Sequence, residues 1–204
     1  LDPAIPDGEN GWYVNDLEVT LTASDPLVMD VSSGVMEIKY QVGGGAIQTI
    51  TGAEGTFLIT QADDDKDVLV EYWAIDNVGN QETHNTFTVD MDQTDPTIDL
   101  VYEWIPNPDG GGWLVTFTAT ANDATSGMDR VEFFLNDGIQ SVVSGSGPTY
   151  QWSFVYFGGL SLDIRADGYD MAGNMASDLV EDPVPTSYNY NQNSQQQTIK
   201  ILQG

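Results

Sequence analysis

The stretch Val19-Thr-Leu-Thr-Ala-Ser-Asp25 decides the fold, because it recurs later in the chain as Phe117-Thr-Ala-Thr-Ala-Asn-Asp123. Two more segments recur in the same order. Ser33-Gly-Val-Met-Glu-Ile-Lys-Tyr-Gln-Val42 recurs as Ser126-Gly-Met-Asp-Arg-Val-Glu-Phe-Phe-Leu135. Asp76-Asn-Val-Gly-Asn80 recurs as Asp170-Met-Ala-Gly-Asn174. The three offsets are 98, 93 and 94 residues. Ordered matches at a nearly constant offset predict two tandem copies of one unit. We place the first copy at residues 1–94 and the second at 95–204.

Apolar and polar residues alternate within each copy. The alternating apolar sets are Leu17, Val19, Leu21 and Ala23, then Ile38, Tyr40 and Val42, then Val68, Val70, Tyr72 and Ala74, and in the second copy Leu162, Ile164 and Ala166. Period two is typical of half-buried antiparallel strands, and no segment sustains the helical period. Turn-forming residues separate the strands at short intervals. The pattern predicts an all-β chain of two tandem immunoglobulin-like antiparallel β-sandwich domains.

These residues also resemble a known group. The segments that carry the resemblance are Asn10-Gly-Trp-Tyr13, Val19 to Asp25, Ser33-Gly-Val35, Asp76 to Asn80 and Val89-Asp-Met-Asp-Gln-Thr-Asp-Pro96. Together they resemble the immunoglobulin-like repeat domains strung along large secreted and cell-surface proteins of bacteria and archaea. The resemblance covers most of the first copy and extends from Phe117 to Asn174 in the second. It implies a spacer, stalk or adhesive module in a surface protein, and it implies no reaction.

The second copy departs from the first after residue 174, where we expect a long loop or tail. Residues 187–197 are polar and rich in amides, and they precede the strand-like segment Thr198-Ile-Lys-Ile-Leu202. One interpretation is a long loop followed by the closing strand of the sandwich. The other is a low-complexity linker toward a further domain. We favour the loop, because the sandwich would otherwise expose an edge.

The charge of the chain excludes several functions. Among 204 residues, 5 are Lys or Arg and 32 are Asp or Glu, which gives a formal net charge of −27. Few cations are available to neutralise phosphates, so we expect no binding to nucleic acid and no docking on an anionic membrane. The chain has no Cys and one His, which excludes disulfides and zinc-thiolate sites.

No run is apolar over the length that spans a bilayer, and Leu1 to Gly11 lacks the pattern of a secretory leader. We expect an extracellular or cell-surface location, as part of a larger protein. The expected partners are neighbouring immunoglobulin-like domains of the same chain, with surface glycans or proteins as further candidates.

The acids point to calcium. Asp outnumbers Glu by 23 to 9, and Asp suits loops, where its carboxylate binds backbone amides or a hard cation. In an immunoglobulin-like sandwich the B–C and F–G loops lie where the chain enters, and the E–F connection lies where it leaves. The acids of 63–65 and those of the second copy's entrance loops should therefore flank the domain boundary. The candidate ligands of one or more calcium ions there are Asp63, Asp65, Asp90, Asp92, Asp95, Asp123 and Asp170.

The calcium hypothesis has a plainer alternative, in which these acids cap turns and face water. The boundary is similar to the calcium-rigidified linkers of cadherins, although Asp90-Met-Asp-Gln-Thr-Asp95 lacks their consecutive acidic and amide ligands. It is not an EF-hand loop, because neither the spacing nor the terminal Glu is present. For the turns Asp76–Asn80 and Asp170–Asn174 we expect hairpin closure, with a metal role for Asp76 beside Asp25 as the alternative.

Other chemistry has less support. Exposed, coplanar rings among the five Trp residues would suit sugar stacking, so the alternative function is a carbohydrate-binding or accessory domain of a secreted hydrolase. By alternation, Tyr72 points inward and Trp73 outward. We expect no enzyme activity, because His84 is the sole imidazole and neither copy has the length for a deep cleft beside its core. The predicted function is a non-catalytic spacer or stalk.

Overall fold

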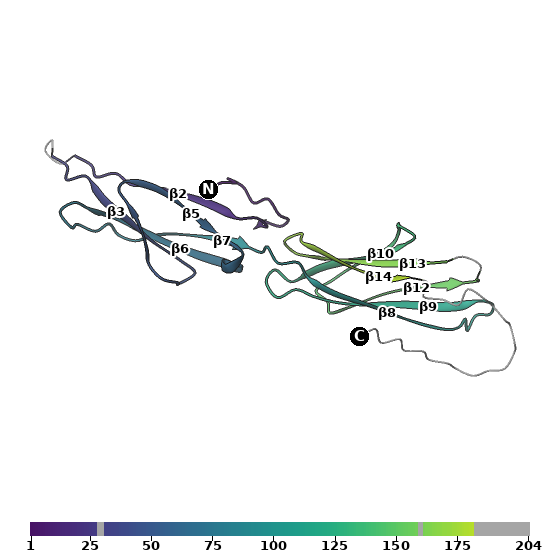
Figure 1. Cartoon of the computed structure of the whole chain (residues 1–204). Helices are drawn as coiled ribbons and strands as arrows, with labels where there is room; N and C mark the ends of the chain where they lie inside the picture. The colour runs from purple at the N-terminus through teal and green to yellow at the C-terminus, as the bar shows by residue number, and fades with distance from the viewer. Residues whose placement is uncertain (28–30, 159–160, 182–204) are drawn as a thin grey trace. The chain divides into compact units, whose positions relative to one another are not determined.

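The computed structural model describes residues 1–27, 31–158 and 161–181. Every regular element in this part of the chain is a strand, apart from one short 3₁₀ turn. The chain divides into two compact units (Figure 1). Unit 1 comprises Leu1–Thr94 with Ala172–Asn174, and unit 2 comprises Asp95–Met171 and the residues from Met175 onward.

Unit 1 contains seven strands in two sheets. The strands are β1 (Trp12–Tyr13), β2 (Leu17–Thr22), β3 (Val35–Val42), β4 (Gln48–Thr51), β5 (Glu54–Ile59), β6 (Asp65–Asp76) and β7 (Asn85–Met91). One sheet has the order β1-β7-β6-β3-β4, and β2 pairs with β5 in the other. The 3₁₀ turn η1 (Gln61–Asp63) joins β5 to β6. Because η1 is the only helical turn in the described ranges and has three residues, none of those residues forms an apolar helix that could cross a membrane.

The described residues of unit 2 also form seven strands in two sheets. The strands are β8 (Thr97–Pro106), β9 (Trp113–Asn122), β10 (Met128–Leu135), β11 (Gly138–Ser144), β12 (Thr149–Tyr156), β13 (Asp163–Asp170) and β14 (Met175–Glu181). One sheet has the order β11-β10-β13-β14, and the other has the order β12-β9-β8. All the strand pairs in unit 2 are antiparallel.

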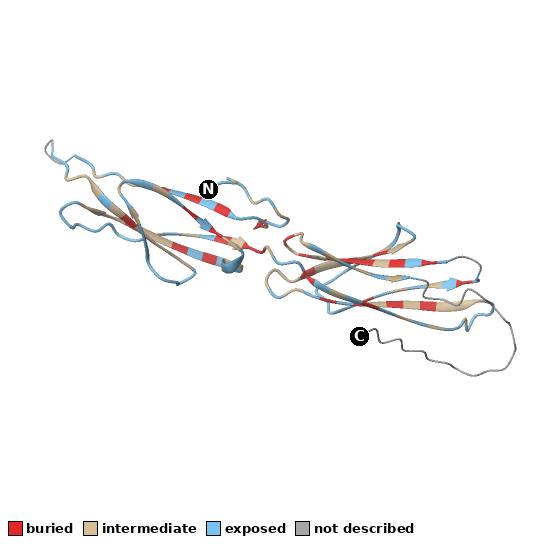
Figure 2. Cartoon of the chain, in the orientation of Figure 1, coloured by how far each residue is buried: buried red, intermediate tan, exposed pale blue. Residues whose placement is uncertain are grey.

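Each unit has its own core, formed between its two sheets. In β2 the buried residues Leu17, Val19 and Leu21 alternate with exposed ones, as predicted (Figure 2). They pack with Ile38 of β3 and Val70 of β6, which belong to the opposite sheet. A separate cluster fills unit 2 and also draws side chains from both of its sheets. Each fully buried side chain of this kind contributes about 1.5–3 kcal/mol, so the alternation holds two sheets face to face in a β-sandwich.

The structure repeats the same irregularity in both units. In unit 1, Val35 lies opposite Asp76, and the register between β3 and β6 then shifts. In unit 2, Met128 lies opposite Asp170, and the register between β10 and β13 shifts at the same point. A bulge at matching positions is a specific local feature, so the sequence repeat corresponds to a structural repeat.

The first strand differs between the units. In unit 2, β8 pairs with β9 along its whole length, from Thr97 opposite Asn122 to Pro106 opposite Trp113. In unit 1, a single bridge joins Asp2 to Glu18 of β2. The chain then crosses to the other sheet, where β1 runs parallel to β7.

One expectation about the second copy is wrong. Residues 175–181 do not belong to a loop or tail, because they form β14, which pairs with β13 from Tyr169 opposite Met175 to Asp163 opposite Glu181. Unit 2 therefore already has its closing strand. The predicted strand Thr198–Leu202 and the polar stretch before it lie outside the described residues.

Candidate metal centre

Several acids at the end of unit 1 that carries η1 support turns. Asp63 Oδ2 accepts a hydrogen bond of 3.0 Å from the Thr60 amide, which caps η1. Asp90 Oδ1 accepts one of 2.7 Å from the amide of Asp67, whose φ of 58° lies in the left-handed region. Asp65 Oδ1 accepts one of 2.8 Å from the Lys66 amide. These three carboxylates therefore have local structural roles, as the capping alternative expects.

Asp64, which the candidate ligand set left out, is different. Its Oδ2 accepts hydrogen bonds from the Gln93 amide at 2.9 Å and from Thr94 Oγ1 at 3.0 Å. Its Oδ1 is buried and has no hydrogen-bond partner among the described residues. A buried acceptor without a donor costs about 1–3 kcal/mol. An oxygen in this state calls for a water molecule or a cation.

Asp92 follows directly after β7 and is fully buried. Its amide donates to the Tyr13 carbonyl at 2.9 Å, and its Oδ1 accepts from the Thr94 amide at 3.1 Å. Its carbonyl accepts at 2.9 Å from Nδ2 of Asn174, a residue that groups with unit 1. Three hydrogen bonds therefore hold Asp92, through its amide, its carboxylate and its carbonyl group.

Unit 2 brings two of the predicted ligands together. Asp123 follows β9 and Asp170 ends β13, and a carboxylate oxygen of each lies within 4.8 Å of one from the other. Asp170 is fully buried. Two negative charges at that distance repel by about 3 kcal/mol at an effective dielectric of 20. The pair is therefore suited to share a cation.

The loop after β9 orients Asp123. Its Oδ1 accepts hydrogen bonds from the amides of Thr125 at 3.0 Å and Gly127 at 2.7 Å. Its Oδ2 accepts none from the residues that the structure describes. One oxygen thus fixes the side chain while the other stays available as a metal ligand.

Unit 1 has an equivalent pair in Asp25 and Asp76. Asp25 Oδ2 accepts from the Ser33 amide, the Gly34 amide and the Ser32 hydroxyl, all at 2.9 Å. The hydroxyls of Ser32 and Ser33 are the main reason that the pKa of Asp25 is lowered. Burial raises the pKa of Asp76, but hydrogen bonds from Asn80 and other donors outweigh it, so the net shift is downward. These donors stabilise both carboxylates as anions without a metal.

The remaining candidate ligands are dispersed. Asp63, Asp65, Asp90 and Asp95 belong to no group of three or more possible ligand side chains within 4.8 Å of one another in the described part of the chain. Asp95 is exposed. The sequence pattern did not distinguish the acids that cap turns from the carboxylates that cluster.

The Trp residues are packed rather than displayed. None of the five Trp residues is in the exposed class. Trp73 lies outside the core cluster of unit 1, as the alternation predicts, yet it is only 6% exposed because the His84 ring stacks on it at 3.8 Å. His84 also contacts Glu71 Oε1 through Nδ1 at 2.7 Å and Gln81 through Nε2 at 2.9 Å. The sole imidazole therefore has a packing role.

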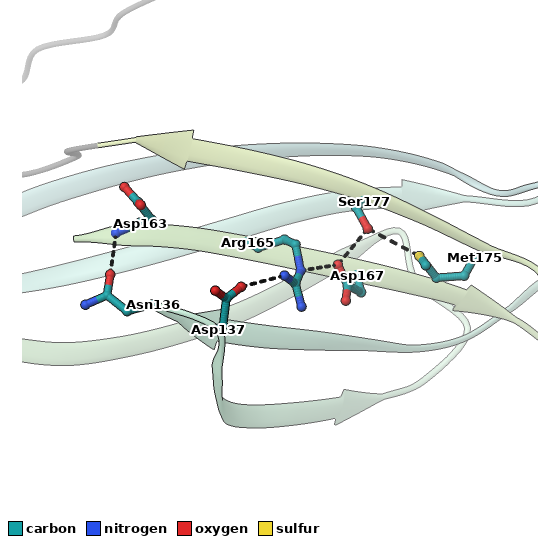
Figure 3. A network of polar contacts seen from close by, with 7 residues as sticks. All are labelled: Asn136, Asp137, Asp163, Arg165, Asp167, Met175 and Ser177. Atoms are coloured by element: carbon teal, nitrogen blue, oxygen red, sulfur yellow. Dashed lines mark hydrogen bonds and ion pairs between the residues drawn. The ribbon is translucent and has the colours of Figure 1, made fainter.

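The outer face of β13 carries a polar network (Figure 3). Arg165 donates through Nε to Asp167 at 2.9 Å and pairs with Asp137 at 3.0 Å. Ser177 Oγ donates to the same Asp167 carboxylate at 2.7 Å. The other arginine, Arg130, pairs with two acids in the same way. Both arginines are thus neutralised by acids of their own unit and are not displayed as a site for phosphates.

A scan against protein-family models and a search of curated proteins found no match. Among solved structures, the chain is similar to the fibronectin(III)-like modules of Clostridium thermocellum CbhA. The identity is 19%, over 88% of this chain and 90% of that chain, and the TM-score is 0.39. A TM-score this low does not by itself establish a shared fold.

Proposed function

We propose that the chain is a non-catalytic structural module, a spacer or stalk in an extracellular or cell-surface protein, made of two tandem immunoglobulin-like domains. The observation that carries the proposal is the repetition of one unit with the same register shift and the same loop acids. Each unit has a closed core of its own. Repeated units that each have their own core lengthen a protein without requiring a catalytic site.

The packing of the chemically distinctive side chains supports this function. His84 stacks on Trp73, and its two ring nitrogens contact Glu71 and Gln81, so both nitrogens already have partners. The alternative, a carbohydrate-binding or accessory domain of a secreted hydrolase, gains no support from the Trp residues. Trp104 and Trp113 meet edge to face at 4.4 Å and pack against the core of unit 2. Such a pair offers no flat stacking platform.

Single-molecule pulling between handles at the two chain ends tests the spacer function. We expect two separate unfolding events per molecule, one for each unit. The event for Leu1–Thr94 should release about 340 Å of chain at about 3.6 Å per residue, less the distance between the ends of the folded unit. A single event, or extension without mechanical resistance, would contradict the proposal that the chain is a spacer that withstands tension.

We further propose that calcium binds where the linker enters unit 2, with Asp92, Asp123 and Asp170 as ligands. Asp92 and Thr97 are five residues apart, which limits their separation to about 16 Å at about 3.3 Å per residue. Thr97 pairs with Asn122, the neighbour of Asp123. The covalent chain alone thus keeps the Asp92 carboxylate within reach of the acid pair.

The donor set fits the ion. Calcium takes six to eight oxygens at about 2.3–2.6 Å, and carboxylates and backbone carbonyls are its usual ligands. Asp123 offers the free Oδ2, and Asp170 is held beside it. Bound calcium would neutralise these acids and restrain the linker at Asp92.

Calcium binding is tested by thermal unfolding in EDTA and in several millimolar calcium. Extracellular modules bind calcium with a Kd of about 10⁻⁴–10⁻³ M, and saturation to about fifty times Kd stabilises by about 2 kcal/mol. We expect a higher melting temperature in calcium for unit 2. Asp123→Asn should abolish the rise, whereas Asp99→Asn, with the same charge change at an exposed site, should retain it.

An unchanged melting temperature at several millimolar calcium would reject the calcium proposal and leave the spacer proposal standing. Asp64→Asn extends the test to unit 1, where the unpartnered Oδ1 lies. If Asp64 is a further ligand, this variant weakens the calcium response. If a water molecule satisfies Oδ1, the response stays as in the wild type.

A further inference from the structure

One edge of β2 has no neighbouring strand over most of its length in the described residues. The Glu18 amide donates to the Asp2 carbonyl at 3.0 Å, and the Asp2 amide donates back at 2.9 Å. Backbone groups alternate between the two edges of a strand, so those of Thr20 and Thr22 point to the same side as those of Glu18. In the described residues, neither Thr20 nor Thr22 pairs with another strand on that side. The edge therefore presents two amides and two carbonyls.

Unit 2 shows what the matching edge accepts. The repeat aligns β2 with β9, and Glu18 with Thr116, which lies opposite Glu103. By the same alignment, a strand beside Thr20–Ser24 would take the place that Thr97–Val101, at the start of β8, has in unit 2. That segment places Leu100, only 5% exposed, into the core of unit 2.

The chain carries a second copy of this segment near its end. Thr97-Ile-Asp-Leu-Val101 matches Thr198-Ile-Lys-Ile-Leu202 in every position but the middle one, allowing exchanges among aliphatic residues. Both have the alternation that sends two aliphatic side chains to one face. In the described residues of unit 2, β8 already occupies the place beside β9, and β14 already pairs with β13.

We propose that Thr198–Leu202 of one copy of this chain adds to the β2 edge of a second copy as an antiparallel strand. Addition of a strand to an open edge is a general mode of recognition, in which main-chain hydrogen bonds give affinity and alternate side chains give specificity. The copies would associate head to tail, and each copy would offer one donor strand and one open edge.

The register follows from β8 and β9. Ile199 and Ile201 take the positions of Ile98 and Leu100, which lie opposite Ala121 and Ala119. Their partners in unit 1 are then Ala23 and Leu21, the second of which belongs to the core. Lys200 lies opposite Thr22.

The charge at position 200 fits this register. Thr22 pairs with Glu54 of β5 on its other side, and Glu18 lies on the same exposed face of β2. Lys200 would therefore sit on a face that carries two acids. The net charge of the chain is −27, so acids are common in it. The register therefore rests mainly on the aliphatic pattern and the open edge.

The mass of the chain in solution is the first test. Light scattering should show the mass rising with concentration for the wild type. The double variant Ile199→Asp with Ile201→Asp should stay monomeric. Asn191→Asp with Asn193→Asp adds the same charge outside the segment and should associate as the wild type does. A wild type that is monomeric at every concentration would overturn the proposal.

A labelled peptide of residues 196–204 tests the register, with the monomeric aspartate double variant as acceptor. N-methylation at Lys200 removes a donor that faces β2 and should weaken binding about tenfold, whereas N-methylation at Ile201, whose amide faces away, should not. Equal losses at both positions would refute the register.

The acceptor edge is tested by Thr22→Pro in the same double variant. Proline is tolerated on an edge where the amide faces solvent, so the melting temperature of unit 1 should change little while peptide binding is lost. Binding that survives this substitution would place the peptide elsewhere and overturn the proposal.

Discussion

Strands β2 and β9 occupy the same place in their units and carry the same alternation, but their surroundings differ. β9 lies between β12 and β8 and is paired on both edges. β2 pairs with β5 on one edge, and on the other it meets only Asp2 among the residues that the structure describes. Their inward faces are equally apolar, since Val19 and Phe117 are both buried. The alternation thus determines which side chains enter the core, whereas the preceding segment determines whether the edge is covered.

The loops of the two units differ in a second way. Both Asp25 and Asp123 are held by amides of the loop that follows their strand, including those of the equivalent Gly34 and Gly127. In unit 1 the hydroxyl groups of Ser32 and Ser33 add to this set. Asp123 keeps one oxygen free beside Asp170. The equivalent loop therefore surrounds the carboxylate with more donors in unit 1 than in unit 2.

Removal of a core side chain should show how independent the two units are. Phe117 is fully buried and contacts the rings of Trp152 and Phe154. Phe117→Ala should lower the stability of unit 2 by about 3–5 kcal/mol. Calorimetry should then show the unit 2 transition at a much lower temperature with the unit 1 transition nearly unchanged. A parallel fall of both transitions would show that the units unfold as one.

Proline substitution should distinguish the paired edge of β9 from the open edge of β2. The repeat gives Thr120 and Thr22 equivalent positions, but Thr120 lies opposite Asp99 of β8. Thr120→Pro removes a ladder hydrogen bond inside a sheet and leaves its acceptor without a donor, which should cost about 1–3 kcal/mol. Thr22→Pro, on the open edge, should cost much less. Urea unfolding of both variants, each in the monomeric background of Ile199→Asp with Ile201→Asp, measures the difference, and equal losses would show that another segment covers β2 in solution.

Acid should act on unit 1 through Asp25 and Asp76. Their folded pKa values are lowered below the ordinary value of 3.8, so the stability that they contribute is present above that value and is lost as the pH falls through the folded pKa. Asp25→Asn should therefore destabilise unit 1 at pH 7 and make little difference near pH 2. Urea unfolding at the two pH values provides the measurement. A variant whose deficit is the same at both would show that the charge of Asp25 contributes nothing.

The strands could be predicted from the sequence because period two requires only local alternation, as at Leu17, Val19 and Leu21. The ends of the units that carry the acids could be predicted too, because loop positions follow from strand order. The closing strand was misassigned. The apolar residues of Met175–Glu181 stand in adjacent pairs and do not alternate, and no pattern in a single sequence shows that this segment pairs with β13.

The individual ligands were harder to predict than their location. Asp63, Asp64 and Asp65 are adjacent in sequence, yet one caps η1, one binds the linker and one bonds the next amide. The direction of each side chain depends on the backbone angles of a three-residue turn, which residue type alone does not determine. The burial of Trp73 has a similar origin, because it depends on His84 from a later segment.

The crossing of the chain from Asp2 to β1 has a mechanical consequence. Trp12 and Tyr13 run parallel to β7, near the point where the chain leaves the unit. A force that pulls the two ends of unit 1 apart would slide these parallel strands past each other, so the hydrogen bonds between them would share the load. In the described part of unit 2, the first strand pairs with β9 in its sheet, and the Leu100 amide donates a hydrogen bond to Asp178 Oδ2 of β14. Under tension, unit 1 should therefore yield at a higher force than unit 2.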